Sequence, residues 1–120
     1  MEFKELQKRV SSDLKEHGNF YNKWNSARQV LENHYKITET WQHQEMLIDL
    51  AEFDLMHSEI SEASEEIRDG NREKAVIELA GLIIRVMCYC ENQGFDLEKY
   101  IISESERNKT RPKLHGRKVI

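Results

Sequence analysis

Apolar residues recur at steps of three and four over most of the chain, which is the period of an amphipathic α-helix. From Phe3 to Leu14 the pattern predicts a helix that ends near Gly18, and a further helical stretch is predicted from Ala27 to Tyr35. The longest helix is expected from about Gln42 to Arg68. Its predicted buried stripe consists of Leu47, Leu50, Phe53, Met56, Ile60, Ala63 and Ile67.

The next predicted helix, from about Arg72 to Glu91, is apolar on most of its circumference and follows the turn Asp69-Gly70-Asn71. Between Ala75 and Cys90 only Glu78 and Arg85 are strongly polar. A helix of this kind must be covered on more than one side, and a chain of 120 residues has little material to do so. We therefore expect an all-α helical bundle completed by oligomerisation, as a homodimer or homotetramer.

The last predicted helix is short, running from near Asp96 to Ile102. The chain beyond Asn108 has no apolar period and is predicted to be extended. A single proline and five glycines agree with long helices and few tight turns. The length is that of one domain, so residues 1–120 are expected to form a single helical unit.

Several classes of protein are disfavoured by composition. No apolar run approaches the length of a membrane span, and the stretch from Met1 to Leu6 lacks the apolar core of a secretory signal, so the expected location is the cytoplasm, with no membrane partner. Cys88 and Cys90 stand two residues apart on a helix, so their side chains diverge. They are predicted to be core thiols, because two cysteines make neither a disulfide framework nor a zinc knuckle.

The net charge of −4 conceals an asymmetry along the chain. The segment from Arg107 to Lys118 holds six cations and no acids, which leaves −10 on the first 106 residues. An acidic body with a basic tail suits a site where acids hold a metal and cations neutralise phosphate. A basic tail without fixed structure and a tail that contacts nucleic acid are the alternatives, and the acidity of the remaining chain argues against nucleic acid.

Glu78 is the candidate residue with the most unusual surroundings, because its helix is otherwise almost wholly apolar. On the preceding helix Glu59, Glu62 and Glu66 follow one another at steps of three and four, so they share one face. Carboxylates offered by two helices predict a site for Mg²⁺ or Mn²⁺, which prefer oxygen ligands. Alternatively, the three acids are a solvated face and Glu78 pairs with an arginine. Arg85 is expected to form a structural ion pair with a glutamate.

Three segments together, residues 57–63, 77–85 and 108–118, resemble the MazG-like family of all-α nucleoside triphosphate pyrophosphohydrolases. The resemblance covers roughly residues 46 to 118. That family carries Glu-x-x-Glu on one helix and Glu-x-x-Asp on the next, followed in one branch by Asn-x-x-Arg-Pro-x-x-His-Gly-x-Lys. The residues of this chain that match the pattern are Glu59, Glu62, Glu78, Asn108, Arg111, Pro112, His115, Gly116 and Lys118.

The resemblance implies Mg²⁺-dependent hydrolysis of a nucleoside triphosphate between its α and β phosphorus atoms, giving a monophosphate and pyrophosphate, in a nucleotide-pool housecleaning role. Residues 46–106 would supply the helices of the metal site and residues 107–120 a basic tail. The implied metal ligands are Glu59, Glu62 and Glu78, with Glu59 and Glu62 also catalytic. The candidates for binding the β and γ phosphates are Lys109, Arg111, His115 and Lys118, of which the last three match the family tail.

A nucleobase pocket is one interpretation of the aromatic and amide cluster at Asn22, Trp24 and Asn25, since rings stack on bases and amides bond to base edges; core packing is the other. The chain departs from the family at Gly81, where the family has its Asp, and at Glu104 and Arg107, where relatives carry lysine and tyrosine. These departures motivate one alternative, a catalytically weakened nucleotide-binding relative. Another alternative is a structural helical interaction module, in which the acids merely pair with the basic tail.

Overall fold

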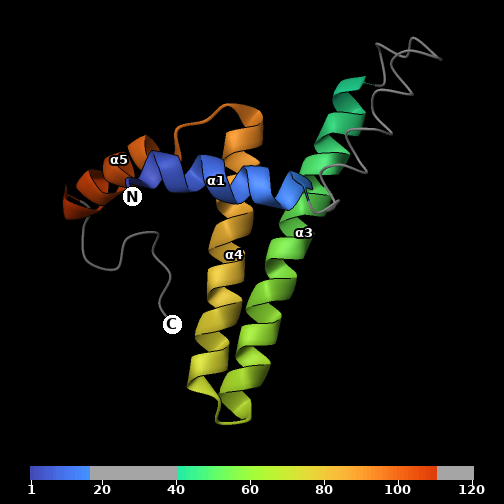
Figure 1. Ribbon diagram of the computed structural model, residues 1–120, viewed down its shortest axis with the longest axis vertical. Coiled ribbons are helices and arrows are strands. Elements are labelled where there is room, and N and C mark those ends of the chain that lie inside the picture. The colour runs from blue at the N-terminus through green and yellow to red at the C-terminus, as the bar shows by residue number, and fades with distance from the viewer. Residues whose placement is uncertain (17–40, 111–120) are drawn as a thin grey trace.

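The computed structural model describes residues 1–16 and 41–110, and this part of the chain folds into four helices without a strand (Figure 1). The all-α prediction is confirmed. The helices are α1 (Phe3–Glu16), α3 (Trp41–Arg68), α4 (Arg72–Gln93) and α5 (Leu97–Thr110). The helix expected from Ala27 to Tyr35 lies outside the described residues.

Helices α3 and α4 form a long antiparallel hairpin around the turn predicted at Asp69-Gly70-Asn71 (Figure 1). Gly70 adopts φ 81°, a left-handed conformation that side chains other than glycine rarely take. The Gly70 amide donates to the Ile67 carbonyl at 3.1 Å, and the Asn71 amide to the Glu66 carbonyl at 2.8 Å. This pair of bonds is the Schellman motif, which satisfies the last carbonyls of α3 and stops the helix at a defined residue.

The end of α4 repeats the same device at Gly94, whose φ is 79°. The Gly94 amide donates to Glu91 and the Phe95 amide to Cys90, so a sharp corner separates α4 from α5. Helix α5 is longer than predicted, because it continues through Asn108 to Thr110 instead of becoming extended there. Ion pairs between residues three apart support the added turns, from Arg107 to Glu104 and from Lys109 to Glu106.

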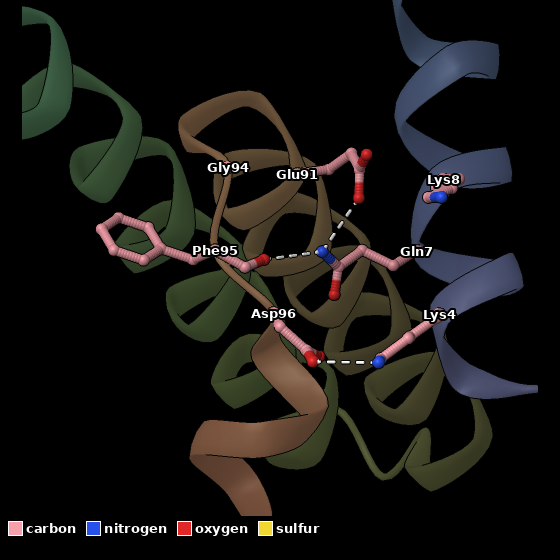
Figure 2. Close-up of a pocket in the computed structure, with 7 residues that line it drawn as sticks. All are labelled: Lys4, Gln7, Lys8, Glu91, Gly94, Phe95 and Asp96. Atoms are coloured by element: carbon pink, nitrogen blue, oxygen red, sulfur yellow. Dashed lines mark hydrogen bonds and ion pairs between the residues drawn. The ribbon is translucent and has the colours of Figure 1, made fainter.

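Helix α1 lies across the half of α4 that is remote from the Gly70 turn (Figure 1). Its buried residues, Gln7 and Ser11, are four apart and therefore share one face. The Gln7 side-chain amide donates to Glu91 Oε1 at 3.1 Å and to the Phe95 carbonyl at 3.0 Å, which ties α1 to the corner between α4 and α5 (Figure 2). An ion pair of 3.2 Å between Lys4 and Asp96 adds a second, more exposed link.

The stripe predicted to be buried on α3 is largely exposed in the single chain. Ala63 is buried and Met56 partly so, but Leu47, Leu50, Phe53, Ile60 and Ile67 keep between 38% and 55% of their surface. The reason is geometric: α3 is 28 residues long, α4 covers one of its sides, and α1 reaches only the far end of the hairpin. Among the residues that the structure describes, the buried apolar ones are Ala63, Ala75, Met87 and Cys88.

Both cysteines are free thiols; Cys88 lies in the core as predicted, whereas Cys90 is only half-buried. Cys88 is buried, and burial raises the pKa of its thiol to about 11, with the negative charge of Glu52 acting in the same direction. This thiol is therefore protonated and unreactive at neutral pH. Among the described residues, no helix combines the length and the apolar character that a membrane crossing requires.

Candidate metal centre

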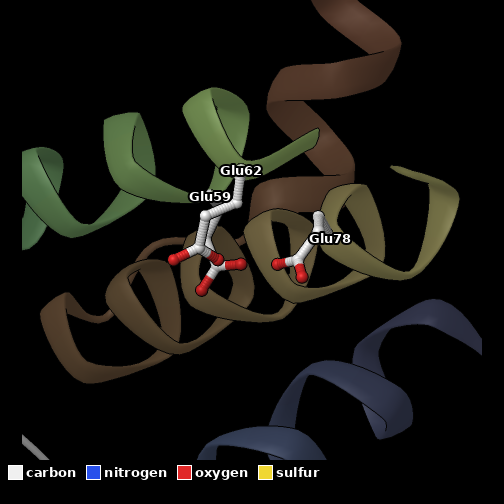
Figure 3. A group of neighbouring side chains, drawn as sticks. All are labelled: Glu59, Glu62 and Glu78. Atoms are coloured by element: carbon white, nitrogen blue, oxygen red, sulfur yellow. The ribbon is translucent and has the colours of Figure 1, made fainter. Parts of the chain in front are cut away.

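The two helices of the hairpin bring Glu59, Glu62 and Glu78 together. Each of the three offers a carboxylate oxygen, and these oxygens lie within 4.8 Å of one another. Figure 3 shows Glu59 and Glu62 reaching from α3 toward Glu78 on α4. The spacing of three residues places the first two on one face of α3, and the antiparallel packing sets Glu78 opposite them. These are the three residues that the sequence pattern assigns to the metal.

The three carboxylates perturb one another. The pKa of the Glu78 carboxyl rises from 4.5 to about 7, first because it shares hydrogen bonds with Glu62 and with Glu59. Partial burial and the negative charges of both neighbours raise this pKa further. Near neutral pH the group therefore holds a proton for part of the time. A cation placed among the three oxygens would displace that proton, because opposite charge favours the ionised form.

Glu59 also forms an ion pair across the seam between the helices. The Arg85 Nε atom donates to Glu59 Oε1 at 3.1 Å, and the two side chains are 31% and 17% exposed. An ion pair between Arg85 and a glutamate was expected from sequence, and the structure identifies the glutamate as Glu59. Arg85 follows Glu78 by seven residues and so faces the same way, which brings a positive charge to the edge of the carboxylate cluster. The neighbourhood thus contains three carboxylates and one guanidinium.

Gly81, the position where the related family has aspartate, lies directly against Glu59. A Cβ atom added at Gly81 would stand 2.9 Å from Glu59 Oε2, closer than such atoms approach in real structures. The missing side chain therefore leaves the space that the Glu59 carboxylate now fills. Position 81 faces the cluster, as expected from its place one turn after Glu78, but it supplies no oxygen.

The structure separates the other acids of α3 from this cluster. Glu66 shares the face of Glu59 and Glu62 but does not join the three converging oxygens; its Oε2 atom is buried and has no hydrogen-bond partner among the described residues. Glu52, which was not predicted as a site residue, is the most deeply buried acid of the described residues, with 1% of its surface exposed. A signal existed: Glu52 precedes Glu59 by seven residues and Ala63 by eleven, so it occupies the inward face of α3.

A concave region lies between α1 and the corner from α4 to α5, with a volume of about 240 Å³. Its lining residues, drawn in Figure 2, are Lys4, Gln7, Lys8, Glu91, Gly94, Phe95 and Asp96. Lys4 is bound to Asp96, and both protons of the Gln7 amide are donated within the protein. These groups fasten α1 to the corner, and the carboxylate cluster remains the candidate for chemistry.

The residues assigned to phosphate and base binding fall mostly outside the described part. Arg111, His115 and Lys118 lie there, and so do Asn22, Trp24 and Asn25. Lys109 is described: it sits in the last turn of α5, and its Nζ atom contacts Glu106 Oε1 at 2.9 Å. Both side chains of that pair are about two-thirds exposed, so the contact is weak enough for a phosphate to replace.

Comparisons with known proteins do not identify a relative. A scan against protein-family models, a search of curated proteins and a search of solved structures each found no match. The resemblance to the MazG-like family therefore stays a prediction that depends on the residues quoted above.

Proposed function

We propose that this chain is a Mg²⁺-dependent nucleoside triphosphate pyrophosphohydrolase that releases pyrophosphate and a nucleoside monophosphate. The observation that carries the proposal is the convergence of Glu59, Glu62 and Glu78 from two helices to within 4.8 Å. These residues were singled out from sequence for this role, and Gly81 lies beside them, where the family motif has its fourth acid. The position of Gly81 supports the alignment of the motif on α4.

The charge of the cluster suits a divalent cation. Three ionised carboxylates beside Arg85 would leave two negative charges in excess, and the raised pKa of Glu78 agrees with charges that are incompletely neutralised. Oxygen ligands without histidine or cysteine favour Mg²⁺ or Mn²⁺ over zinc. When bound, the metal supplies positive charge to the phosphate oxygens of the substrate and promotes attack by water.

Residues of the chain itself would orient the carboxylates, accept a proton and bind the phosphates. Arg85 donates to Oε1 of Glu59 at 3.1 Å, and this ion pair restricts the direction of the Glu59 carboxylate. Glu62 is the more exposed acid and is the better placed to take a proton from an incoming water. The cations proposed for the β and γ phosphates, including Lys109, would neutralise the leaving pyrophosphate.

A weakened, nucleotide-binding relative is the second candidate, and two observations favour it. Gly81 contributes no ligand, and Arg85 already neutralises part of the charge of Glu59. Both features lower the attraction of the cluster for a metal. A purely structural helical module is the third candidate, and it is favoured by the large apolar residues that α3 and α4 expose.

Pyrophosphate release separates these candidates. A panel of canonical and damaged nucleoside triphosphates is incubated with the protein, with and without Mg²⁺, and the Glu78→Gln variant is the control for a contaminating enzyme. Turnover that requires both Mg²⁺ and Glu78 supports the enzyme. Metal-dependent binding of a triphosphate without turnover supports the weakened relative, and the absence of both favours the structural module.

A further inference from the structure

The concave region between α1 and the corner from α4 to α5, which we call the α1 hollow, contains an acceptor without a donor. Gln7 lines this hollow and keeps only 4% of its surface exposed. Its Oε1 atom is buried and has no hydrogen-bond partner among the described residues. Leaving a buried acceptor unpaired costs free energy, and proteins rarely do so. The oxygen therefore indicates that a donor from outside the described residues completes the site.

The Gln7 amide cannot turn to relieve this cost. Its Nε2 atom donates one proton to Glu91 Oε1 at 3.1 Å and the other to the Phe95 carbonyl at 3.0 Å. Exchanging the nitrogen and the oxygen would set Oε1 against two acceptors. Figure 2 shows the oxygen pointing away from Glu91, toward the side where Lys4 and Asp96 meet. The missing donor must therefore approach from that side.

On that side the hollow is closed by the ion pair between Lys4 and Asp96. Lys4 Nζ lies 3.2 Å from Asp96 Oδ2, and the two side chains are 62% and 37% exposed. Ion pairs with this exposure contribute little to stability, so they open at small cost. Opening would free one carboxylate and one ammonium group in the hollow that Gln7 lines.

The charges and the size of the α1 hollow restrict its occupant. Lys4 and Lys8 line it together with Glu91 and Asp96, so positive and negative charges balance. Lys8 is exposed and forms no ion pair within the part of the chain that the structure describes. Balanced charges suit a ligand with both signs better than a polyphosphate. The volume of about 240 Å³ lies below the roughly 300–1,000 Å³ of sites for drug-sized ligands, so the ligand is small.

We propose that the α1 hollow binds a small zwitterion, such as a free amino acid. The ammonium group of the ligand donates to Gln7 Oε1 and to Asp96, where it replaces Lys4. The carboxylate of the ligand accepts from Lys4 and Lys8. Charge-assisted hydrogen bonds of this kind are stronger than those between neutral groups, and here they form at both ends of the ligand.

This site is separate from the carboxylate cluster. Glu91, which lines the hollow, follows Glu78 by 13 residues on α4, which is about 20 Å along the helix axis. The inference therefore goes beyond the proposed function and depends on neither the metal nor the hydrolysis. Because the ligand contacts α1 and the residue before α5 together, its binding should stabilise the packing of α1.

A set of four-carbon compounds tests the charge pattern. γ-Aminobutyrate and α-aminobutyrate carry both charges at different separations, butylamine carries only the positive charge, and butyrate only the negative one. Each is titrated into the full chain at constant ionic strength, up to about 50 mM, and the NMR shifts of the α1 backbone amides report binding. At least one of the zwitterions should bind about 10-fold more tightly than butylamine and butyrate.

Two substitutions each remove one charge from the hollow. Lys8→Met should weaken binding of the zwitterion at least about 5-fold but leave butylamine within about 2-fold, because only a carboxylate contacts Lys8. Asp96→Asn keeps an oxygen for the Lys99 amide at the start of α5. It should weaken the zwitterion and butylamine at least about 5-fold without weakening butyrate. Lys74→Met and Asp54→Asn are the matched controls, since both residues are exposed and lie outside the hollow.

The buried acceptor itself is tested by Gln7→Met, which keeps a side chain of similar length without the oxygen. This variant should weaken the zwitterion and butylamine at least about 10-fold and butyrate less than about 2-fold. If its amide shifts show that α1 has detached, the two charge variants decide the question.

Several results would overturn the proposal. A parent that binds none of the compounds would mean that water alone completes Gln7 Oε1. Equal affinity for all of them would show that the hollow does not recognise charge. A Lys8→Met or Asp96→Asn variant that behaves like its control, or a folded Gln7→Met variant with the affinities of the parent, would equally contradict the assignment.

Discussion

Under α1 the α3–α4 hairpin buries Glu52, Met87 and Cys88, whereas beside the Gly70 turn its buried side chains, within the described residues, are the two alanines Ala63 and Ala75. The difference arises because α1 packs across only one half of the hairpin. Where a third helix crosses the pair, large and polar groups become enclosed. Where no other described helix crosses the pair, small residues fill the seam, acids gather on one side and large apolar residues are exposed on the other. The covered half contains the most enclosed large side chains of the described residues, and the other half, called the bare half because no described helix crosses it, carries the three converging acids and exposed apolar residues.

The largest effect is expected from truncating the covered half. Met87 is 4% exposed, so Met87→Ala should lower the free energy of unfolding by about 2–5 kcal/mol through lost burial and an unfilled cavity. Met46, which is 47% exposed, provides the matched control, and Met46→Ala should cost less than about 1 kcal/mol. Urea denaturation of both variants measures the difference. Similar losses would mean that burial under α1 does not set the stability of the chain.

Substitution of Gly81 tests the carboxylate side of the bare half. Any side chain here must push Glu59 Oε2 away, because the new Cβ would stand 2.9 Å from it. Gly81→Ala should therefore disturb the ion pair with Arg85 and weaken Mg²⁺ binding. Gly81→Asp supplies an oxygen as well, and we expect it to raise Mg²⁺ affinity about 10-fold over Gly81→Ala, which corresponds to about 1.4 kcal/mol.

Isothermal titration with Mg²⁺ measures both Gly81 variants against the parent. Gly81→Asp should also destabilise the metal-free protein through added negative charge, and Mg²⁺ should reverse this loss. Two variants with the affinity of the parent would show that position 81 lies outside the site.

The ion pair from Arg85 to Glu59 should show a modest coupling. Because both side chains are partly exposed, a double-mutant cycle of Arg85→Met and Glu59→Gln is expected to give about 1 kcal/mol in the metal-free protein. The pair from Arg107 to Glu104 is a matched control, since its side chains are 61% and 56% exposed and its coupling should be smaller. A coupling near zero between Arg85 and Glu59 would show that the guanidinium does not stabilise the carboxylate cluster.

The pH dependence of stability should reveal the crowding at Glu78. Its pKa in the folded chain, about 7, lies above the ordinary 4.5, so the folded state binds the proton more tightly than the unfolded state. The resulting stabilisation is fully present below about pH 4.5 and is lost as the pH rises through about 7. The metal-free parent should therefore lose stability over this window relative to Glu78→Gln. Thermal midpoints of both proteins from pH 4 to 8 (roughly the titration range) test this, and parallel curves would contradict it.

Much of the fold was predictable because its signals are local. Helical periodicity located α1, α3 and α4, and the glycines at the ends of α3 and α4 marked the corners, since left-handed caps favour glycine. The length of α5 was missed because its second half has no apolar period and is supported by ion pairs between residues three apart. The exposure of the α3 stripe was missed because periodicity predicts which residues share an apolar face of a helix, but not whether another element covers that face.

The candidate site likewise has features that were predictable from sequence and features that depend on packing. The three acids could be chosen from spacing and from the resemblance, and the hairpin brings them together. The space at Gly81 that Glu59 fills, the glutamate that Arg85 selects and the deep burial of Glu52 depend on how two helices pack, which no single helix specifies. Sequence reasoning therefore selected the three acids that converge but not the contacts that orient them.

Mn²⁺ binding measured by electron paramagnetic resonance, in the parent and in two glutamate variants, tests the metal centre most directly. Glu78→Gln removes one of the three converging carboxylates, while Glu66→Gln changes an acid of α3 that lies on the same face but outside them. The account predicts that the parent binds Mn²⁺ and that Mg²⁺ displaces it. Glu78→Gln should then bind at least about 10-fold more weakly, and Glu66→Gln within about 2-fold of the parent. A parent that binds no Mn²⁺, or two variants that behave alike, would contradict the assignment of this cluster as a metal centre.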